Sequence, residues 1–460
     1  MAPRFLLAGA LSVAICFHCN DGREAESTKG GFTIGPAGKK DGCQPMPANP
    51  GDRKTLLVVS QTFVPDPASV GQHMADAALE LASRGHRVRV LASARGYENP
   101  NAVYPLKERL GGADVCRFRF ASFGKRSILV RVAGTAAFMV QAFFAALFQK
   151  RLGAIFFSTS PPLIGLPLCI VAAVRRVPAI YWAMDLNPDQ LIALGKLRST
   201  DWTTRLLEAV NRFILRRAAL IVALDRFMAD RLAHRGVPRD KMLVMPPWPH
   251  EQHIQADPGG NPFRLRHNLQ DKFIIMYSGN HSPSNPLTTL LDAAVQLKGD
   301  ANLRFLFVGG GSGKAQVEAY IGNHNLTNVI SLPYQPLAEL KYSLSAADVH
   351  AVSLGEPMVG IIHPCKIYGA MAAGKPVLFL GPRPSHISDI LESHGIGVQV
   401  GHGDVPAMLA AIEKFRAMPS ALLQEMGNRA RTALRESFSQ DDLRRRFCDA
   451  VEAASRLERS

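Results

Sequence analysis

The chain has 460 residues, of which 47% are hydrophobic, so it is long enough to bury two substantial cores. Its net charge of +15 lies in the first part, because residues 1–250 carry 33 Lys and Arg against 18 Asp and Glu, whereas residues 251–460 carry 20 of each. This asymmetry predicts contact with an anionic surface such as a membrane leaflet, and a generally basic soluble surface is the alternative. Nucleic-acid binding is not expected, because the basic residues lack interleaved aromatics and known motifs.

The seven cysteines are scattered without a regular spacing, which favours reduced thiols in a cytoplasmic protein. Cys16 and Cys19 form a CxxC pair, but no second ligand pair follows at zinc spacing, so no metal site is predicted. Residues 1–53 are expected to be a disordered or signal-like extension. Its apolar start resembles a signal peptide without a clean cleavage site. It is either a weak membrane anchor, or the true start of the protein lies nearer Lys54.

The first domain opens with a predicted strand over 56–60, a helix from about Val70 and a strand over 88–92. Ser69 and Gln72 have the spacing of a capping box at the start of that helix. The first turn carries no GxGxxG, and no acidic residue closes the second strand. A dinucleotide cofactor is therefore not expected.

The run 132–148 is mostly apolar and is flanked by basic residues, namely Arg126, Arg131, Lys150 and Arg151. It is shorter than the ~20 residues that a membrane span needs. The pattern predicts either a buried helix of the first domain or a helix lying in the membrane interface between the basic flanks. A true span is the third alternative.

A polar turn follows the strand predicted over 179–182 and contains Asp185 and Asn187. In an open α/β sheet, ligands bind at the carboxyl ends of the strands. Asp185 is therefore expected either to orient a ligand hydroxyl or to cap the next helix.

Residues 246–249 (Pro-Pro-Trp-Pro) mark a linker, and from Phe273 onward strands and helices alternate. Such alternation predicts a parallel, doubly wound sheet. Two glycine-bearing turns follow strands in this region, at 279–282 and 309–313. Glycine lets backbone amides approach an anion without a Cβ clash. Each turn alone is equally well explained as a tight turn.

A helix predicted to begin at Pro364 carries Lys366 in its first turn. A cation there opposes the helix dipole at a cost of up to about 1 kcal/mol, unless an anion binds at the same end. A diphosphate would supply that anion and would take the helix's unbonded N–H groups. His363, just before this helix, is expected either to contact such a ligand or to act as a capping or core residue.

Residues 364–377 resemble the Pro-Ser-Lys-x-Tyr-Glu-x-Met-Ala-x-Gly-x-Pro-Val signature of sugar-nucleotide-dependent glycosyltransferases of family 4. An Arg-Gly-His-x-Val turn of the same family matches residues 84–88, and the resemblance extends over about 54–435. The family's two donor-site glutamates are replaced by Ile361 and Gly369. A branch involved in exopolysaccharide and O-antigen assembly is similar to this glycine-bearing version.

The resemblance implies the GT-B fold, an α/β architecture with two Rossmann-like domains facing across a cleft. The acceptor-side domain would cover 54–250, the donor domain 265–438 and a crossover helix 439–460. It implies transfer of a sugar from a nucleotide sugar to a lipid-linked or saccharide acceptor, with retention, without cofactor or metal. The protein is expected to be cytoplasmic, peripheral on the inner face of the membrane. A sugar-nucleotide epimerase of the same fold or a non-catalytic nucleotide-sugar-binding module is the alternative.

Lys366 and Asp185 are the expected catalytic residues. The expected donor-binding residues are Gly279, Asn280, His281, Gly309, Gly310, Gly311, His363, Pro364 and Lys366. The expected acceptor-side residues are Gly71, Gln72, Asp185 and Asn187.

Overall fold

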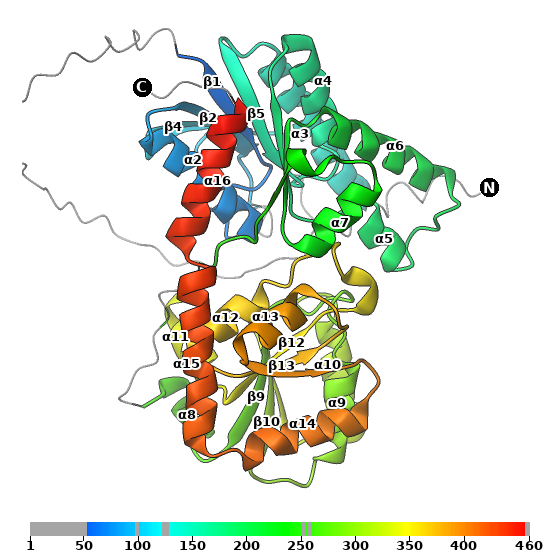
Figure 1. The fold of residues 1–460 in the computed structure, drawn as a ribbon, viewed down its shortest axis with the longest axis vertical. Helices are drawn as coiled ribbons and strands as arrows, with labels where there is room; N and C mark the ends of the chain where they lie inside the picture. The colour runs from blue at the N-terminus through cyan, green and yellow to red at the C-terminus, as the bar shows by residue number, and fades with distance from the viewer. Residues whose placement is uncertain (1–52, 97–100, 122–127, 251–253, 255–259, 456–460) are drawn as a thin grey trace, which may run out of the picture.

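The computed structural model describes residues 53–96, 101–121, 128–250, 254 and 260–455, so the expectations for the N-terminal extension lie outside it. Within the described ranges the chain forms two α/β units, each built on its own sheet (Figure 1). The upper unit in that view contains the N-terminal part of the chain and the lower unit the C-terminal part. The two-sheet α/β architecture predicted from the sequence is confirmed.

The first sheet has eight strands in the order β3-β4-β2-β1-β5-β6-β7-β8, and all neighbours are parallel except β3 and β4. Helices make the crossovers that parallel strands require. The strands are β1 (Thr55–Val59), β2 (Arg87–Ser93), β3 (Lys107–Leu110), β4 (Ala113–Phe118), β5 (Leu152–Ser158), β6 (Ala179–Ala183), β7 (Leu220–Ala223) and β8 (Met242–Val244). The helices are α2 (Ser69–Ser83), α3 (Ile128–Leu147), α4 (Gly165–Arg175), α5 (Asp189–Ala193), α6 (Trp202–Arg217), α7 (Arg226–His234) and the 3-10 turn η1 (Arg239–Lys241).

The second sheet has six parallel strands in the order β11-β10-β9-β12-β13-β14. Its strands are β9 (Phe273–Ser278), β10 (Leu303–Val308), β11 (Val329–Leu332), β12 (Val349–Ser353), β13 (Val377–Leu380) and β14 (Gly397–Val400). Its helices are α8 (Pro262–Arg266), α9 (Thr288–Gln296), α10 (Lys314–His324), α11 (Leu340–Ser345), α12 (Lys366–Ala373), α13 (His386–His394), α14 (Val405–Ala417) and α15 (Ser420–Ser437), with 3-10 turns η3 (Leu337–Glu339) and η4 (Glu356–Met358).

The last helix, α16 (Gln440–Ser455), leaves the second unit and packs on the first, where it continues upward from α15 in Figure 1. Its Phe447 is fully buried, with ring centroids 4.3 Å from Trp182 and 5.6 Å from Trp248. On the same helix, the carboxylate of Glu452 accepts a hydrogen bond from His86 Nε2, with a distance of 2.9 Å between the two atoms. An aromatic cluster and a buried polar contact therefore fix the end of the chain to the first sheet.

The capping box predicted at the start of α2 is wrong. Ala68 occupies the N-cap position and no side chain caps the helix, because Ser69 is already its first helical residue. Gln72 instead donates from Nε2 to the carbonyl of Pro67 at 3.2 Å. The interpretation of Asp185 as a helix cap is also wrong, since α5 has Pro188 at its N-cap.

Helix α3 has apolar side chains on both its buried and its exposed face. By length and composition its stretch Val130–Leu147 could cross a membrane, and 28% of that stretch is buried. The buried stripe consists of Phe138, Ala142 and Ala146. The exposed stripe continues past the helix end and consists of Val140, Phe144 and Phe148. The buried-helix interpretation therefore accounts for one face of α3 only.

Candidate functional site

The carboxyl ends of the parallel strands in the first sheet face those in the second sheet. Asp185, which follows β6, forms an antiparallel bridge with Ile362, and Leu186 N donates to Ile361 O at 3.0 Å. Nearby, Arg231 Nε donates to Val359 O at 2.8 Å. The segment 359–363 thus joins the two units at the edge where open α/β sheets bind their ligands.

Lys366 lies in the first turn of α12, as predicted, and its side chain extends over the first glycine turn. Its Nζ lies 3.3 Å from Asn285 Oδ1 and 5.5 Å from the centroid of the Tyr277 ring. A Cβ atom on Gly279 would lie only 2.7 Å from Lys366 Cε. The absence of a side chain at residue 279 therefore makes room for the lysine stem.

The two glycine turns pack directly on each other. Gly279 N donates to Val308 O at 2.9 Å, and His281 N donates to Gly310 O at 2.7 Å. A Cβ on Gly309 would lie 2.1 Å from Gly279 O, and its φ of +132° favours glycine. A Cβ on Gly311 would lie 2.0 Å from Asn280 Oδ1. The turns that the sequence placed at separate strands therefore form one surface next to Lys366.

Burial lowers the pKa of Lys366 to about 8. Lys314 is also the first residue of a helix, and burial lowers its pKa too. Its Nζ, however, donates to the carbonyls of Phe307, at 3.3 Å, and Leu332. Lys314 therefore closes the second glycine turn, whereas Lys366 lies beside both turns and would gain from a bound anion, which favours its charged form.

His281 lies between the two glycine turns and is 1% exposed. Its pKa is lowered to about 4, mainly by burial, so the ring is neutral at physiological pH. Its Nδ1 lies 3.3 Å from Gly310 O, which can only accept, so we assign the ring proton to Nδ1. Its Nε2 is buried without a hydrogen-bond partner among the described residues. This nitrogen can accept a hydrogen bond from a ligand hydroxyl.

The start of α12 differs from the sequence-based expectation in two respects. The helix begins at Lys366 rather than at Pro364, which is buried just before it. The amides of Ile367 and Tyr368 already donate to the carbonyls of Pro364, at 3.4 Å, and Cys365, at 3.0 Å. These two N–H groups are therefore occupied within the turn, and the lysine side chain is the main anion-binding group that this helix end offers.

His363 contacts the other unit of the protein. Its Nδ1 lies 3.2 Å from Asp225 Oδ2, and its Nε2 lies 2.8 Å from the hydroxyl of Tyr368, which also lies 3.2 Å from His386 Nε2. The side chains of His363 and Asp225 are 1% and 2% exposed. The hydrogen bond to His363 is the largest of the causes that hold the pKa of Asp225 below its usual range despite its burial. Because both ring nitrogens are bonded in this chain, the structure favours the core interpretation of His363 over direct ligand contact.

Asp225, His363 and His386 are also the set of described residues whose geometry fits a metal ion, with ligand atoms within 4.8 Å of one another. Two histidines and a carboxylate are chemically suited to zinc. The hydrogen bonds that join His363 with Asp225 and with Tyr368 already account for this arrangement.

On the opposite side of the contact, Asp185 is half-buried, and burial raises its pKa to about 6. A carboxyl group that titrates close to neutral pH is suited to orient a hydroxyl or to receive its proton. Asn187, in the same turn, has a buried Oδ1 without a hydrogen-bond partner among the described residues. Gly71 lies against the loop after β1, where a Cβ would lie 3.0 Å from Phe63 N, and Gln72 lies beside it.

Both residues that replace the family glutamates have apolar surroundings. Ile361 is 2% exposed and belongs to a hydrophobic cluster that includes residues of both units. Gly369 lies within buried α12, where a Cβ would make only an ordinary 3.6 Å contact with Leu344. Packing therefore requires an apolar residue at position 361 but does not require glycine at position 369.

Several polar residues of this region were missed by the sequence analysis. Asn285 accepts from Lys366, and Tyr334 donates from its hydroxyl to Gly310 O at 3.1 Å. Asp225 lies between the short strand β7 and helix α7 and could have been recognised as a cap, since it accepts from Met228 N at 2.8 Å. Its contact with His363 joins residues 138 positions apart and has no local sequence signal.

Each of the two units of the chain matches the model of a known protein family. Residues 69–248 match the model described as glycosyl transferase 4-like domain, and residues 262–433 match the model described as glycosyl transferases group 1. Together the two models cover about three quarters of the chain.

Two curated relatives extend the comparison. The chain is 26% identical over 383 residues to WcaI of Escherichia coli, a glycosyl transferase provisionally assigned to colanic acid biosynthesis, covering 79% of this chain and 92% of the relative. It is 25% identical over 334 residues to WbjE of Pseudomonas aeruginosa, provisionally assigned as a glycosyltransferase, covering 70% and 80%.

Solved structures show the same fold at lower identity. Sucrose-phosphate synthase from Thermosynechococcus elongatus has a TM-score of 0.67 at 18% identity, covering 87% of this chain and 99% of that one. HepE of Anabaena in complex with UDP and glucose has a TM-score of 0.64 at 17% identity, covering 87% and 100%. WaaG, a glycosyltransferase involved in lipopolysaccharide biosynthesis, has a TM-score of 0.63 at 15% identity, covering 86% and 99%.

We predict that Asp185→Asn slows turnover while the affinity for the ligand beside Lys366 stays almost unchanged. The wild-type rate should rise with pH through about 6, because the carboxylate is the active form and its pKa lies there. That folded-state pKa lies above the usual 3.8, so the ionised carboxylate disfavours folding at neutral pH and the melting temperature of the variant should be unchanged or higher.

Rate against pH and melting temperature, measured for both proteins, check this prediction. Asp240→Asn, at an exposed position of η1, is the matched control. A large loss of affinity for the ligand beside Lys366 in Asp185→Asn, or a variant rate that still follows the wild-type pH profile, would contradict it.

Proposed function

Because the chain belongs to the sugar-nucleotide-dependent glycosyltransferases of the GT-B fold, we propose that it moves a sugar from a nucleotide-diphosphate sugar to a lipid-linked or polysaccharide acceptor. The proposed pathway is the biosynthesis of cell-surface polysaccharide. Relatives assigned to colanic acid and lipopolysaccharide biosynthesis support this pathway, and complexes of HepE with UDP and UDP-glucose support the donor class.

The single observation that carries the proposal is the position of Lys366 beside the two packed glycine turns. The half-buried side chain of Lys366 brings a positive charge next to these closely packed turns, and a diphosphate bound beside the turns would lie next to that charge. Transfer needs stabilisation of negative charge on the leaving diphosphate, and a preorganised cation in a partly buried site provides it. Lys366 would bind the diphosphate in the donor and stabilise it as it leaves.

The proposed reaction retains the anomeric configuration. The bond between the anomeric carbon and the diphosphate breaks, and the acceptor oxygen forms a new bond to that carbon on the same face. The acceptor proton passes to the departing phosphate, while Asp185 orients the acceptor hydroxyl from the other sheet. We propose that no metal takes part, because Lys366 supplies the positive charge that a metal would otherwise bring to the diphosphate.

We also propose that the first unit rests on the cytoplasmic face of a membrane through α3 and α4. Phe144 and Phe148 stack with centroids 6.4 Å apart, and Phe148 is 73% exposed. Val174 of the neighbouring α4 is 65% exposed, and Arg175 of α4 donates to the carbonyl of Leu147 at the end of α3. Exposed Lys150, Arg151 and Arg176 flank these apolar side chains. An apolar surface with basic flanks matches the chemistry of an anionic bilayer.

We predict that Lys366→Ala lowers donor affinity or turnover about ten- to a hundredfold, because a charge-assisted contact of roughly 1.5 to 3 kcal/mol is lost. The folded-state pKa of about 8 lies below the usual 10.5, so folding disfavours the charged form and removing it should not lower the melting temperature. Initial rates with radiolabelled donor and thermal melts test both parts. Added EDTA should leave the wild-type rate unchanged.

Lys272→Ala in the second unit is the matched control for Lys366→Ala. Wild-type turnover in Lys366→Ala would remove the donor role of this lysine. Lost activity together with a lower melting temperature would indicate a structural contact instead. Release of an epimerised sugar nucleotide without transfer would favour the epimerase alternative.

We predict that Phe144→Ser with Phe148→Ser reduces flotation of the protein with vesicles containing anionic phospholipid. The loss should exceed that caused by Leu337→Ser, which removes an 85% exposed leucine from the second unit. High salt should weaken wild-type binding, because the basic flanks contribute through screened charges. Equal binding of the wild type to neutral and anionic vesicles would remove the electrostatic part, and no binding to either would contradict the membrane contact.

A further inference from the structure

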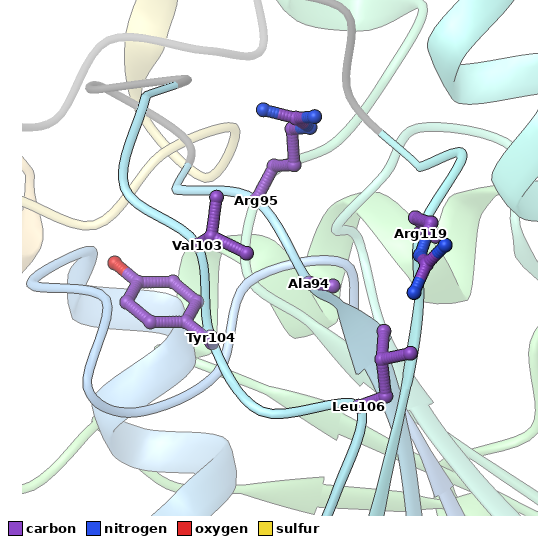
Figure 2. Close-up of a pocket in the computed structure, with 6 residues that line it drawn as sticks. All are labelled: Ala94, Arg95, Val103, Tyr104, Leu106 and Arg119. Atoms are coloured by element: carbon purple, nitrogen blue, oxygen red, sulfur yellow. The ribbon is translucent and has the colours of Figure 1, made fainter.

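A cavity of about 350 Å³ lies at the carboxyl edge of the first sheet (Figure 2). Its lining comes from the ends of two neighbouring strands, β2 and β4, and from the connection between β2 and β3. The lining residues are Ala94, Arg95, Val103, Tyr104, Leu106 and Arg119. None of them was singled out by the sequence analysis.

The chemistry of this cavity combines positive charge with apolar surface. Arg95 and Arg119 are both exposed, and Figure 2 shows their guanidinium groups above and to the right of the cavity. Val103 and Tyr104 lie on the left in the same view, and Leu106 lies below Arg119. Two guanidinium groups around one small cavity are suited to bind phosphate oxygens with paired N–H donors. The valine and leucine side chains suit an adjoining hydrocarbon group.

Arg95 and Arg119 are the positively charged residues of the cavity lining. Arg117, on β4 behind Tyr104, is buried and forms an ion pair with Glu108. Its guanidinium also donates to the carbonyls of Pro105, at 2.9 Å, and Val64, at 2.8 Å. Arg117 therefore supports the wall of the cavity, whereas Arg95 and Arg119 line it.

The cavity and Asp185 lie at the same edge of the first sheet, the edge formed by the carboxyl ends of its parallel strands. Arg95 follows β2 just as Asp185 follows β6, and the strands between them, β1 and β5, are parallel to both. Three strand spacings separate β2 from β6, which corresponds to about 14 Å along the edge. A phosphate-linked saccharide can extend over this distance, with its phosphate in the cavity and its reacting hydroxyl at Asp185.

We infer that this cavity binds the phosphate or diphosphate group of the acceptor, where a saccharide is joined to its lipid. The inference rests on the proposed function and names the group of the acceptor that the first unit recognises. Arg95 and Arg119 bind the phosphate oxygens, and Val103 and Leu106 contact the first part of the hydrocarbon chain. The acceptor is thereby held at one end of the sheet edge while its sugar reaches the donor beside Lys366.

Isothermal titration calorimetry with the full-length protein tests the inference with three probes, farnesyl diphosphate, farnesol and inorganic pyrophosphate. The variant combines Arg95→Gln with Arg119→Gln. Arg87→Gln is the matched control, because Arg87 is an exposed arginine at the opposite end of β2. The double variant should bind farnesyl diphosphate at least about tenfold more weakly than the wild type, because two charge-assisted contacts are lost. Arg87→Gln should bind it as the wild type does.

Farnesyl diphosphate should bind the wild type more tightly than farnesol or pyrophosphate does. Equal affinity of wild type and double variant for farnesyl diphosphate would overturn the inference. Equal losses for farnesol and farnesyl diphosphate would also overturn it, since the phosphate would then not be the recognised group. Wild-type binding of pyrophosphate as tight as that of the lipid form, lost equally in the double variant, would identify a site for free phosphate and overturn the acceptor assignment.

Failure of this inference can be told apart from failure of the proposed function. Donor binding is measured separately, as the thermal stabilisation of each variant by nucleotide sugars. The double variant should be stabilised as strongly as the wild type, because Lys366 and the glycine turns are unchanged. A wild type that binds donor and farnesyl diphosphate but transfers no sugar would contradict the function and leave the phosphate site in place.

Discussion

The contact of segment 359–363 with the first unit sets the positions of both parts of the proposed site. Backbone pairing of Ile362 with Asp185 and the buried bond between His363 and Asp225 join the carboxyl edges of two separate sheets. Gly360 permits this approach, because a Cβ there would lie 2.6 Å from Phe227 O. Since Lys366 follows three residues after His363, the same contact places the lysine opposite the turn that carries Asp185.

Charge is distributed over this edge in a way that suits two anionic substrates. Lys366 supplies positive charge beside the two closely packed glycine turns of the second sheet. Arg95 and Arg119 line a cavity at the same edge of the first sheet as Asp185. Burial moves the pKa of Lys366 down to about 8 and that of Asp185 up to about 6, so both groups titrate near physiological pH. Groups tuned in this way are common at sites of chemistry.

Local sequence patterns predicted the two sheets and the place of Lys366 in a first helical turn, and the donor-binding roles of the residues around it stay predictions. Alternating strands and helices gave the parallel architecture, and the position of Lys366 in a first helical turn indicated an anion site before any contact was known. Residues far apart in the chain could not be predicted in the same way. The hydrogen bond between Asp225 and His363 depends on how strands lie side by side in space, and so does the position of Arg95 and Arg119 around one cavity. Short caps were also misjudged, as at Ser69, because neighbouring backbone geometry decided which residue began the helix.

The central claim is that a nucleoside diphosphate binds beside Lys366 and favours its charged form. Calorimetry of UDP, GDP and dTDP binding at pH 8, in buffers that differ in ionisation enthalpy, measures this directly. At that pH the nucleotide phosphates are already deprotonated, since phosphate monoesters have a second pKa near 6. A lysine with a pKa of about 8 is about half protonated there, so binding should take up a fraction of a proton, and this uptake should vanish near pH 6.5. Tight binding without proton uptake at pH 8 would contradict the account.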